Sequence, residues 1–207
     1  MLKRAVYLII FLFISISAKA QINLYLGGNV QGNYTWIRGD EPTFNTGFGG
    51  GFSFVYWEYE YWFIKVGIDY HHKSSSILDY SDIYGVPPLE PDDKIRIDYT
   101  EQAVGIPLTF YFRPYERGEN ALLLTGTLET IVVASLKADS EEYGELVLPA
   151  DGARTLIKTN VGLGIGYQRQ FDKNTFLNLV ASYNIDVRGT PTYNCVTLTA
   201  ELIFGVY

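Results

Sequence analysis

Several features that would restrict the fold or the chemistry are scarce in this sequence. It contains a single cysteine, Cys195, so no disulfide can form within the chain. Acidic residues outnumber basic ones by 23 to 16, which argues against the basic surface that nucleic-acid binding requires. After residue 20, no apolar run approaches the roughly 20 residues of a membrane-spanning helix. Any membrane-spanning part of the exported chain must therefore be built from strands.

The first twenty residues have the pattern of a secretory signal peptide. Met1 to Arg4 is a basic start, Ala5 to Ser17 is apolar, and Ala18-Lys19-Ala20 is a small-x-small cleavage site. We therefore expect a cleaved signal peptide at 1–20 and a single exported domain at 21–207. Without the three basic residues of the signal peptide, the domain has 13 basic and 23 acidic side chains, a formal charge of −10.

Eight segments of the exported domain alternate between apolar and polar residues. In the first, every second residue from Ile22 to Trp36 is apolar or glycine, a period that belongs to a strand and not to a helix. Between Tyr99 and Val104 the apolar phase shifts by one residue, which predicts a β-bulge near Thr100 to Ala103. The remaining segments with this period are 47–56, 62–71, 95–112, 122–136, 161–167, 177–187 and 196–206.

The connections between these segments are alternately long and short. The short ones are 57–60, 113–119 and 170–174, the long ones are 37–45, 73–94 and 138–154, and the last, 188–194, is fairly short. Transmembrane β-barrels have tight turns on the periplasmic side and longer loops outside. The sequence therefore predicts an all-β fold, an eight-stranded antiparallel up-and-down transmembrane β-barrel with both ends in the periplasm.

The polar face of the segments favours a membrane barrel over a soluble one. A soluble barrel alternates too, but its outer face is usually rich in Lys and Glu, whereas here the polar positions are mostly Asn, Gln, Ser, Thr and Gly. Small and polar residues suit the narrow interior of an eight-stranded barrel. The alternative is a soluble, secreted, lipocalin-like barrel that binds a small apolar ligand in its lumen.

Aromatic residues gather near the predicted turns and predict two girdles at the membrane boundaries. The periplasmic girdle would contain Tyr56, Trp57, Tyr59, Tyr61, Trp62, Phe112, Tyr115, Phe171, Phe176 and Tyr207. The outer girdle would contain Tyr34, Trp36, Phe48, Tyr70 and Tyr99. Tyr207 is out of phase with the apolar face of the last segment, so Phe204 is the alternative in-phase aromatic residue.

Three stretches resemble one known family. The run Gly105-Ile106-Pro107-Leu108-Thr109-Phe110-Tyr111-Phe112, the glycine-rich stretch from Val161 to Tyr167, and the stretch from Asn178 to Tyr183 are similar to strands of the PorT-like small outer-membrane β-barrel family. The resemblance implies an eight-stranded barrel in the outer membrane of a Gram-negative bacterium. It supplies no catalytic residues.

Few residues point to a chemical site. His71 and His72 are adjacent on a strand, so they face opposite sides and cannot jointly bind one metal ion. Asp69 and His71 share a face, as an acid–base pair would, but no serine nucleophile is identifiable from spacing; an outer-membrane hydrolase or acyltransferase is therefore a minor alternative. The glycine clusters at 47–51 and 162–166 lack the following helix of a phosphate loop and are expected to be packing glycines. We expect no catalytic residue, cofactor or metal.

Three charged residues fall near the middle of predicted strands on the polar face. Lys65, Glu129 and Glu201 are expected to meet inside the barrel as a charge network, because a charge turned toward lipid at mid-depth costs about 2–4 kcal/mol for Lys or Arg. Such a network would close the lumen. An eight-stranded barrel is too narrow for an open channel.

The long connections carry 12 of the 23 acidic residues. These are Asp40, Glu41, Asp79, Asp82, Glu90, Asp92, Asp93, Asp139, Glu141, Glu142, Glu145 and Asp151. A plain solvated surface explains them; the sharper alternative is divalent-cation bridging to lipopolysaccharide, or a basic partner. The function predicted from sequence is a non-enzymatic membrane anchor in the outer membrane. Its loops, above all 73–94 and 138–154, would serve adhesion, envelope assembly or secretion by contacting an envelope protein partner.

Overall fold

The computed structural model describes residues 23–37, 45–80, 94–146, 157–188 and 192–206. The predicted signal peptide and Tyr207 lie outside these residues, as do most acidic residues of the long connections. The described strands are β1 (Leu24–Ile37), β2 (Asn45–Tyr59), β3 (Trp62–Tyr80), β4 (Lys94–Arg117), β5 (Asn120–Ser140), β6 (Gly144–Glu145), β7 (Ile157–Asp172), β8 (Thr175–Arg188) and β9 (Tyr193–Gly205). No helix among the described residues is long and apolar enough to span a membrane.

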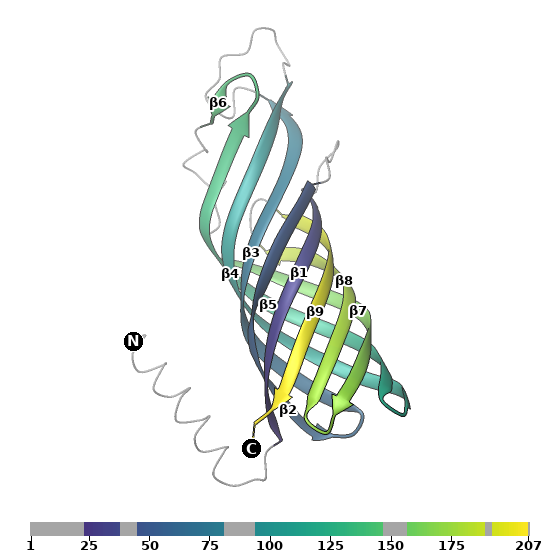
Figure 1. Ribbon diagram of the computed structural model, residues 1–207. Helices are drawn as coiled ribbons and strands as arrows, with labels where there is room; N and C mark the ends of the chain where they lie inside the picture. The colour runs from purple at the N-terminus through teal and green to yellow at the C-terminus, as the bar shows by residue number, and fades with distance from the viewer. Residues whose placement is uncertain (1–22, 38–44, 81–93, 147–156, 189–191, 207) are drawn as a thin grey trace, which may run out of the picture.

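Eight of these strands form a closed antiparallel barrel (Figure 1). Around the wall the order is β4, β3, β2, β1, β9, β8, β7 and β5, and pairing of β4 with β5 closes the ring. The seam between the first and last strands runs from Tyr25 opposite Gly205 to Ile37 opposite Tyr193. The short strand β6 pairs only with the end of β5 and takes no part in the ring. The prediction of an eight-stranded antiparallel barrel is confirmed.

The short turns and the two chain ends of the barrel lie together. The β2–β3, β4–β5 and β7–β8 turns lie at the same end as the start of β1 and the close of β9 (Figure 1). Backbone hydrogen bonds tie this turn end together, from the Trp57 amide to the Asn23 carbonyl and from the Gly205 amide to the Asn174 carbonyl. At the opposite end, β3, β4 and β5 continue well beyond the other strands (Figure 1).

The barrel wall is apolar outside and polar inside. Phe52 and Leu163 are 81% and 77% exposed, whereas Glu201 and Lys65 are 1% and 5% exposed. Every strand of the ring contributes an exposed apolar side chain: Val30, Phe52, Ile68, Ile106, Leu128, Leu163, Leu179 and Leu198. Every strand also contributes a buried polar one: Asn29, Ser53, Lys65, Thr109, Glu129, Asn160, Asn178 and Glu201. A water-soluble domain has the reverse arrangement.

The phase shift in 95–112 has a different cause from the predicted bulge. Alternation along β4 is unbroken, so Ile97 and Tyr99 face inward on the same side as Thr109 and Tyr111. What changes along this strand is the polarity of the inward residues, which become apolar beyond the barrel. The bulge lies in β5 instead: Gln102 pairs with Ser135 while Ala103 pairs with Val133, which leaves Ala134 as the extra residue. The bulge turns Leu136 inward, against its predicted outward position.

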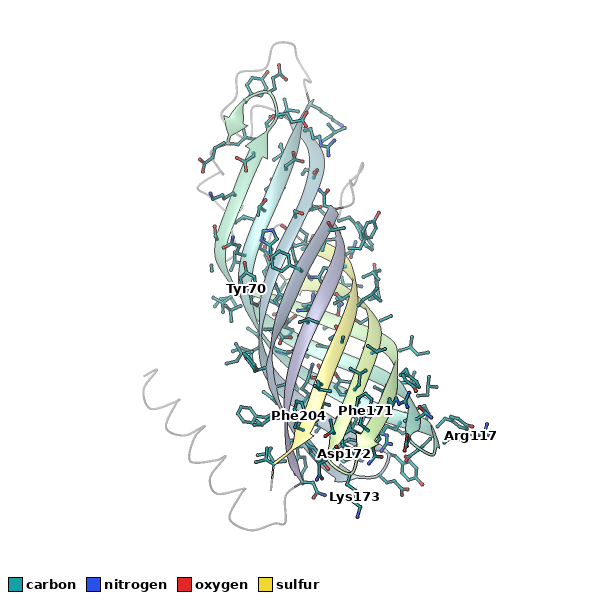
Figure 2. The ribbon with its side chains drawn as sticks, viewed as in Figure 1. Tyr70, Arg117, Phe171, Asp172, Lys173 and Phe204 are labelled. Atoms are coloured by element: carbon teal, nitrogen blue, oxygen red, sulfur yellow. The ribbon has the colours of Figure 1, made fainter. Side chains whose placement is uncertain are left out.

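Three predicted girdle residues face the interior. Trp57, Phe176 and Tyr99 are 8%, 4% and 6% exposed, and all three belong to buried apolar clusters. The prediction was wrong for them because closeness to a turn does not fix the face on which a strand residue lies. In contrast, Tyr61, Tyr115 and Phe171 at the turns and Tyr70 toward the other end are exposed. Figure 2 shows Phe171 and Phe204 near the turn end and Tyr70 far above them.

Candidate functional site

The turn end of the lumen is filled by an aromatic plug of Trp57, Phe63, Tyr111 and Phe176. The ring centroids of Phe63 and Tyr111 are 4.4 Å apart, and Trp57 lies 4.7 Å from both Phe63 and Phe176. The guanidinium of Arg113 lies 4.9 Å above the Trp57 ring and donates a hydrogen bond to the Glu60 carbonyl. The plug therefore seals this end of the barrel with packed rings.

Above the plug, Glu201 is the centre of a buried polar group. Its Oε1 lies 3.1 Å from Nζ of Lys65 and accepts a hydrogen bond from the Ser53 hydroxyl. Its Oε2 accepts hydrogen bonds from the Tyr111 hydroxyl, at 3.1 Å, and from the Asn178 amide, at 3.2 Å. The structure thus brings together two of the three residues of the predicted charge network, Lys65 and Glu201.

The third residue of that prediction, Glu129, belongs to a separate group. Its Oε1 lies 2.7 Å from Nε2 of His71, and Nδ1 of His71 lies 3.2 Å from the amide nitrogen of Gln31. Sequence reasoning did not assign His71 to this network, although its position on β3 has the same parity as Lys65. Asp69 does not contact His71 in the manner of an acid–base pair, because its Oδ1 accepts a hydrogen bond from Asn29 at 2.9 Å.

A third group lies at the level above which β3, β4 and β5 continue beyond the other strands. The ammonium of Lys158 donates a short hydrogen bond to Glu101, and both side chains are fully buried. Asp186 accepts hydrogen bonds from the Asn160 amide and from the Tyr193 backbone, each at 3.2 Å. The sequence missed this group because Glu101 fell in the predicted bulge and Lys158 preceded the predicted strand at 161–167.

Inward glycines leave the space that these polar groups occupy. A Cβ atom at Gly105 would overlap Oε1 of Glu129 and would lie 2.6 Å from Nε2 of His71. A Cβ atom at Gly51 would overlap Oδ1 of Asp69. For Gly51, a member of the predicted cluster 47–51, the expectation of a packing glycine thus has a specific physical reason, and Gly105, which lies outside both clusters, leaves room for a buried charge in the same way.

The groups surround a small cavity of about 70 Å³, which is large enough to hold water. Among its lining residues are Gln31, Asn33, Lys65, Asp69, His71, Lys73, Tyr111, Glu129, Asn160 and Cys195. The Asn33 amide nitrogen and the Asn160 amide oxygen are buried and have no hydrogen-bond partner among the described residues. These two groups lie at the cavity, where a bound water would find hydrogen-bond partners.

The histidines and the cysteine are placed for structure. His72 faces the outer side and stacks on Phe48, with ring centroids 4.9 Å apart. Both ring nitrogens of His71 are occupied by Gln31 and Glu129, and Sγ of Cys195 lies 3.3 Å from the Thr197 hydroxyl. Within the described ranges, no group of three His, Cys, Asp or Glu residues could hold a metal ion.

The second candidate site is the extension, formed by β3 from Lys73, by β4 up to Gln102, by β5 from Val133, and by β6. Its β3–β4 ladder runs from Lys73 opposite Glu101 to Tyr80 opposite Lys94. The predicted loops 73–94 and 138–154 are therefore partly strand. Apolar residues of its inner face form a core together with Ile37 of β1 and Tyr193 of β9. The members from the extension and the residue after it are Ile95, Ile97, Tyr99, Val133, Leu136, Ala138 and Leu146, with Ile77 packed against them.

The outer face of the extension is polar and exposed. Arg96 and Lys137 are exposed there, as are the acids Glu141 and Glu142 of the turn that leads into β6 and Glu145 of β6 itself. The core inside and the charges outside are the arrangement of a water-soluble sheet. The extension therefore lies beyond the apolar belt of the barrel wall.

The closed antiparallel wall with its apolar outer belt defines the fold of a small outer-membrane β-barrel. Among solved structures, the chain is similar to Neisserial surface protein A, with 12% sequence identity, coverage of 88% of this chain and 97% of that one, and a TM-score of 0.55. It also matches the attachment invasion locus protein Ail of Yersinia pestis, with 15% identity, coverage of 88% and 99%, and a TM-score of 0.42. No family model and no curated protein matches the chain, so the resemblance to the PorT-like family has no support from these comparisons.

Proposed function

We propose that this protein is a non-enzymatic outer-membrane anchor that holds the extension at the cell surface for recognition. The observation that carries the proposal is that β3, β4 and β5 each continue as one strand from the wall into the extension. The wall is apolar on its outer face, whereas the extension is polar on its outer face and apolar inside. The extension is thus a rigid continuation of the barrel. A rigid platform holds the turn between β5 and β6 and the adjacent loops in fixed positions for a partner.

The filled lumen argues against a channel. The aromatic plug closes the turn end, buried ion pairs fill the middle, and the core of the extension covers the other end. The space between them, about 70 Å³, is too small for a solute path. The three buried pairs, Lys65 with Glu201, His71 with Glu129 and Lys158 with Glu101, serve in this proposal as a structural filling.

The soluble lipocalin-like alternative fits these features poorly. A lipocalin-like protein needs an apolar cavity inside, but the luminal cavity here is lined mainly by polar and charged side chains. The apolar hollows lie on the outer wall instead, such as one of about 690 Å³ over Leu108, Leu128 and Leu163. Lipid chains would fill these hollows in a bilayer.

The partners in this proposal are the bilayer with its lipopolysaccharide and an envelope protein. The exposed acids Glu141, Glu142 and Glu145, together with Asp139, favour a basic partner surface or divalent cations that bridge to anionic lipopolysaccharide. Nucleic acid is not expected as a partner, given the formal charge of −7 for the whole chain.

Cell fractionation with a gel of unboiled and boiled samples tests the anchor. The protein is expected in the outer-membrane fraction, where the folded barrel migrates differently before and after boiling. A single band in the soluble periplasmic fraction would contradict the proposal.

The recognition role needs a second test that keeps the barrel. A variant in which a short turn replaces residues 78–96 removes the distal β3–β4 ladder and leaves the wall pairing below Ile77 and Ile97 in place. We expect it to insert normally and to lose cross-links that form through a photo-reactive group at Lys137. A photo-reactive group placed at the lipid-facing position Leu163 is the comparison. If it forms cross-links to the same protein as the group at Lys137, the extension is not the recognition surface.

A further inference from the structure

The end of β8 contains a β-bulge that changes the direction of Arg188. Asn160 of β7 pairs with Asp186, but Thr159 pairs with Arg188, which leaves Val187 as the extra residue. In a regular strand Arg188 would lie on the same face as Asp186, which is buried in the lumen. Opposite residues of an antiparallel pair point to the same side, and Thr159 lies on the outer face of β7. The bulge therefore places the Arg188 side chain outside the barrel, where it is exposed.

Arg188 begins a row of hydrogen-bond donors on the outer wall. Among the described residues, no carboxylate oxygen lies within 4 Å of its guanidinium. Arg188 of β8 is opposite Thr159 of β7, and Thr159 is opposite Thr130 of β5. These three residues, called the polar row below, offer one cation and two hydroxyl groups on one face. Guanidinium and hydroxyl groups are donors that bind phosphate oxygens.

The polar row lies at the end of the wall that is opposite the turns. Arg188 is the last residue of β8. Earlier on the same strand, Tyr183 belongs to an aromatic group: its ring centroid is 6.1 Å from that of Trp36, and the Trp36 centroid is 6.5 Å from that of Tyr34. Aromatic rings of this kind gather at the level of the lipid headgroups. Arg188 therefore lies where the phosphate groups of lipids are expected.

The outer-wall hollow of about 690 Å³ begins directly below the polar row. Its lining includes Leu128, Val161 and Ile185, which pair with one another and form the next outward row on the same three strands. Two residues along a strand span about 7 Å, so one lipid molecule can reach both the polar row and the hollow. A charged contact and an apolar seat thus lie side by side on the same part of the wall.

We propose that the outer wall of β5, β7 and β8 binds one phosphate-bearing lipid, the lipid A part of lipopolysaccharide. A lipid A phosphate contacts the Arg188 guanidinium and the Thr159 hydroxyl, and an acyl chain lies in the hollow. This contact is direct and needs no divalent cation, unlike bridging through the acids of the extension. The inference rests on the proposed position of the barrel in the outer membrane, but not on recognition by the extension.

Native mass spectrometry of the folded barrel in detergent micelles tests the charged contact. The probes are lipid A and lipid A without its phosphate groups. We expect a preference for the phosphorylated lipid, and Arg188→Gln should weaken its binding about tenfold. Arg117→Gln is the matched control, because it removes the same charge from an exposed position at the turn end (Figure 2). Equal affinity for the two lipids, or an equal loss in both variants, would overturn the proposal.

Inorganic phosphate separates a lipid from a free anion as the occupant. In excess over lipid A it should not displace the lipid, because it has no chain to place in the hollow. Displacement would overturn the assignment to a lipid.

A second pair of variants tests the apolar seat. Gly126 lines the hollow, and a Cβ atom there would meet no other heavy atom within 4 Å, so Gly126→Leu should fill the hollow and leave the wall intact. Gly28 of β1 has the same open surroundings away from this hollow, and Gly28→Leu is the control. We expect only Gly126→Leu to weaken lipid A binding. An equal effect of the two changes, or none, would overturn the assigned seat.

Folding and location are measured separately from binding. A gel of unboiled and boiled samples shows that each variant is folded before its affinity is compared. Cell fractionation tests the anchor: a barrel found outside the outer membrane contradicts the proposed function, whereas a barrel in the outer membrane that does not prefer phosphorylated lipid A contradicts only the lipid site.

Discussion

The extension continues three strands of the barrel wall, β3, β4 and β5, but has the opposite polarity. On β4, Thr109 and Tyr111 lie inward among charges while Ile106 and Leu108 face out. Higher on the same strand, Ile95 and Ile97 lie inward in a core while Arg96 faces out. The geometry of the strand is constant, so the change reports a change of surroundings. The level of Gln102 and Ala103 therefore marks where the wall is expected to leave the lipid.

The largest effect is expected from breaking a buried charge pair in the barrel. Glu201→Gln leaves Lys65 buried without its counter-charge and should lower the free energy of unfolding by about 3–5 kcal/mol. Lys65→Met in the same chain should restore part of this loss. Urea titration in lipid vesicles measures the coupling.

A matched pair of variants serves as the control. Lys65→Met and Glu129→Gln should be closer to additive, because Glu129 contacts His71 rather than Lys65. Strong coupling between Lys65 and Glu129, or none between Lys65 and Glu201, would contradict the two separate groups.

The next largest effect tests the outer face of the wall. Leu163→Arg places a charge at a position that is 77% exposed in the apolar belt and should cost about 2–4 kcal/mol if that belt faces lipid. Asp139→Arg is the control in the extension, where the new cation would face Asp98 across the β4–β5 ladder. We expect the heat-modifiable gel band to be lost in the first variant and retained in the second. If both variants keep the heat-modifiable band, the outer faces of the wall and of the extension do not differ in their surroundings, and the comparison between the two regions is wrong.

The same substitution, Ile→Val, should have different and smaller effects on the two faces of β4. Ile97→Val removes a methylene from the core of the extension and should destabilise it by about 0.5–1.5 kcal/mol. Ile106→Val, at an exposed position of the wall, should have almost no effect, since mobile lipid chains fill the space. Hydrogen exchange measures both; faster exchange is expected only in the extension of the first variant.

The smallest effect concerns pH at the turn end. The Asn174 amide donates a hydrogen bond to Asp172 at 2.8 Å, and this bond lowers the pKa of the Asp172 carboxyl below its usual 3.8. The turn is thus stabilised above the ordinary aspartate pKa, and the stabilisation is lost as pH falls through the lowered value. Because Asp172 is fully exposed, the change should be local. The Asn174 amide shift should move only below the ordinary pKa, and Asp172→Ala should abolish the movement.

The alternation of residues predicted much of the barrel, because a period of two is a local property of the chain. It placed Lys65, Glu129 and Glu201 inside and gave the number of strands. It could not predict that Glu129 meets His71, since such contacts depend on how neighbouring strands are staggered around the ring. The prediction of an outward position for Trp57 and Phe176 was wrong for another reason. Both lie near turns, which favoured a girdle position, although their place in the alternation puts them on the inner face.

The change of apolar phase between Tyr99 and Val104 predicts a bulge only if the whole strand lies in one environment. A strand that crosses from lipid into water changes which of its faces is apolar while its backbone stays regular. The bulge at Ala134 had no signal of its own in the sequence. Leu136 continued the outward apolar pattern in the sequence, and only the pairing of β5 with β4 reveals the extra residue.

The seam between β1 and β9 sets the order in which this barrel can form. One edge of β1 pairs with β2, but its other edge pairs with the last strand, β9, across nearly the whole chain, from Tyr25 opposite Gly205 to Ile37 opposite Tyr193. Until β9 arrives, both edge strands are open and the apolar belt is incomplete. A truncation that removes only β9 is therefore expected to leave an open sheet, with unpaired edges on β1 and β8, rather than a smaller barrel.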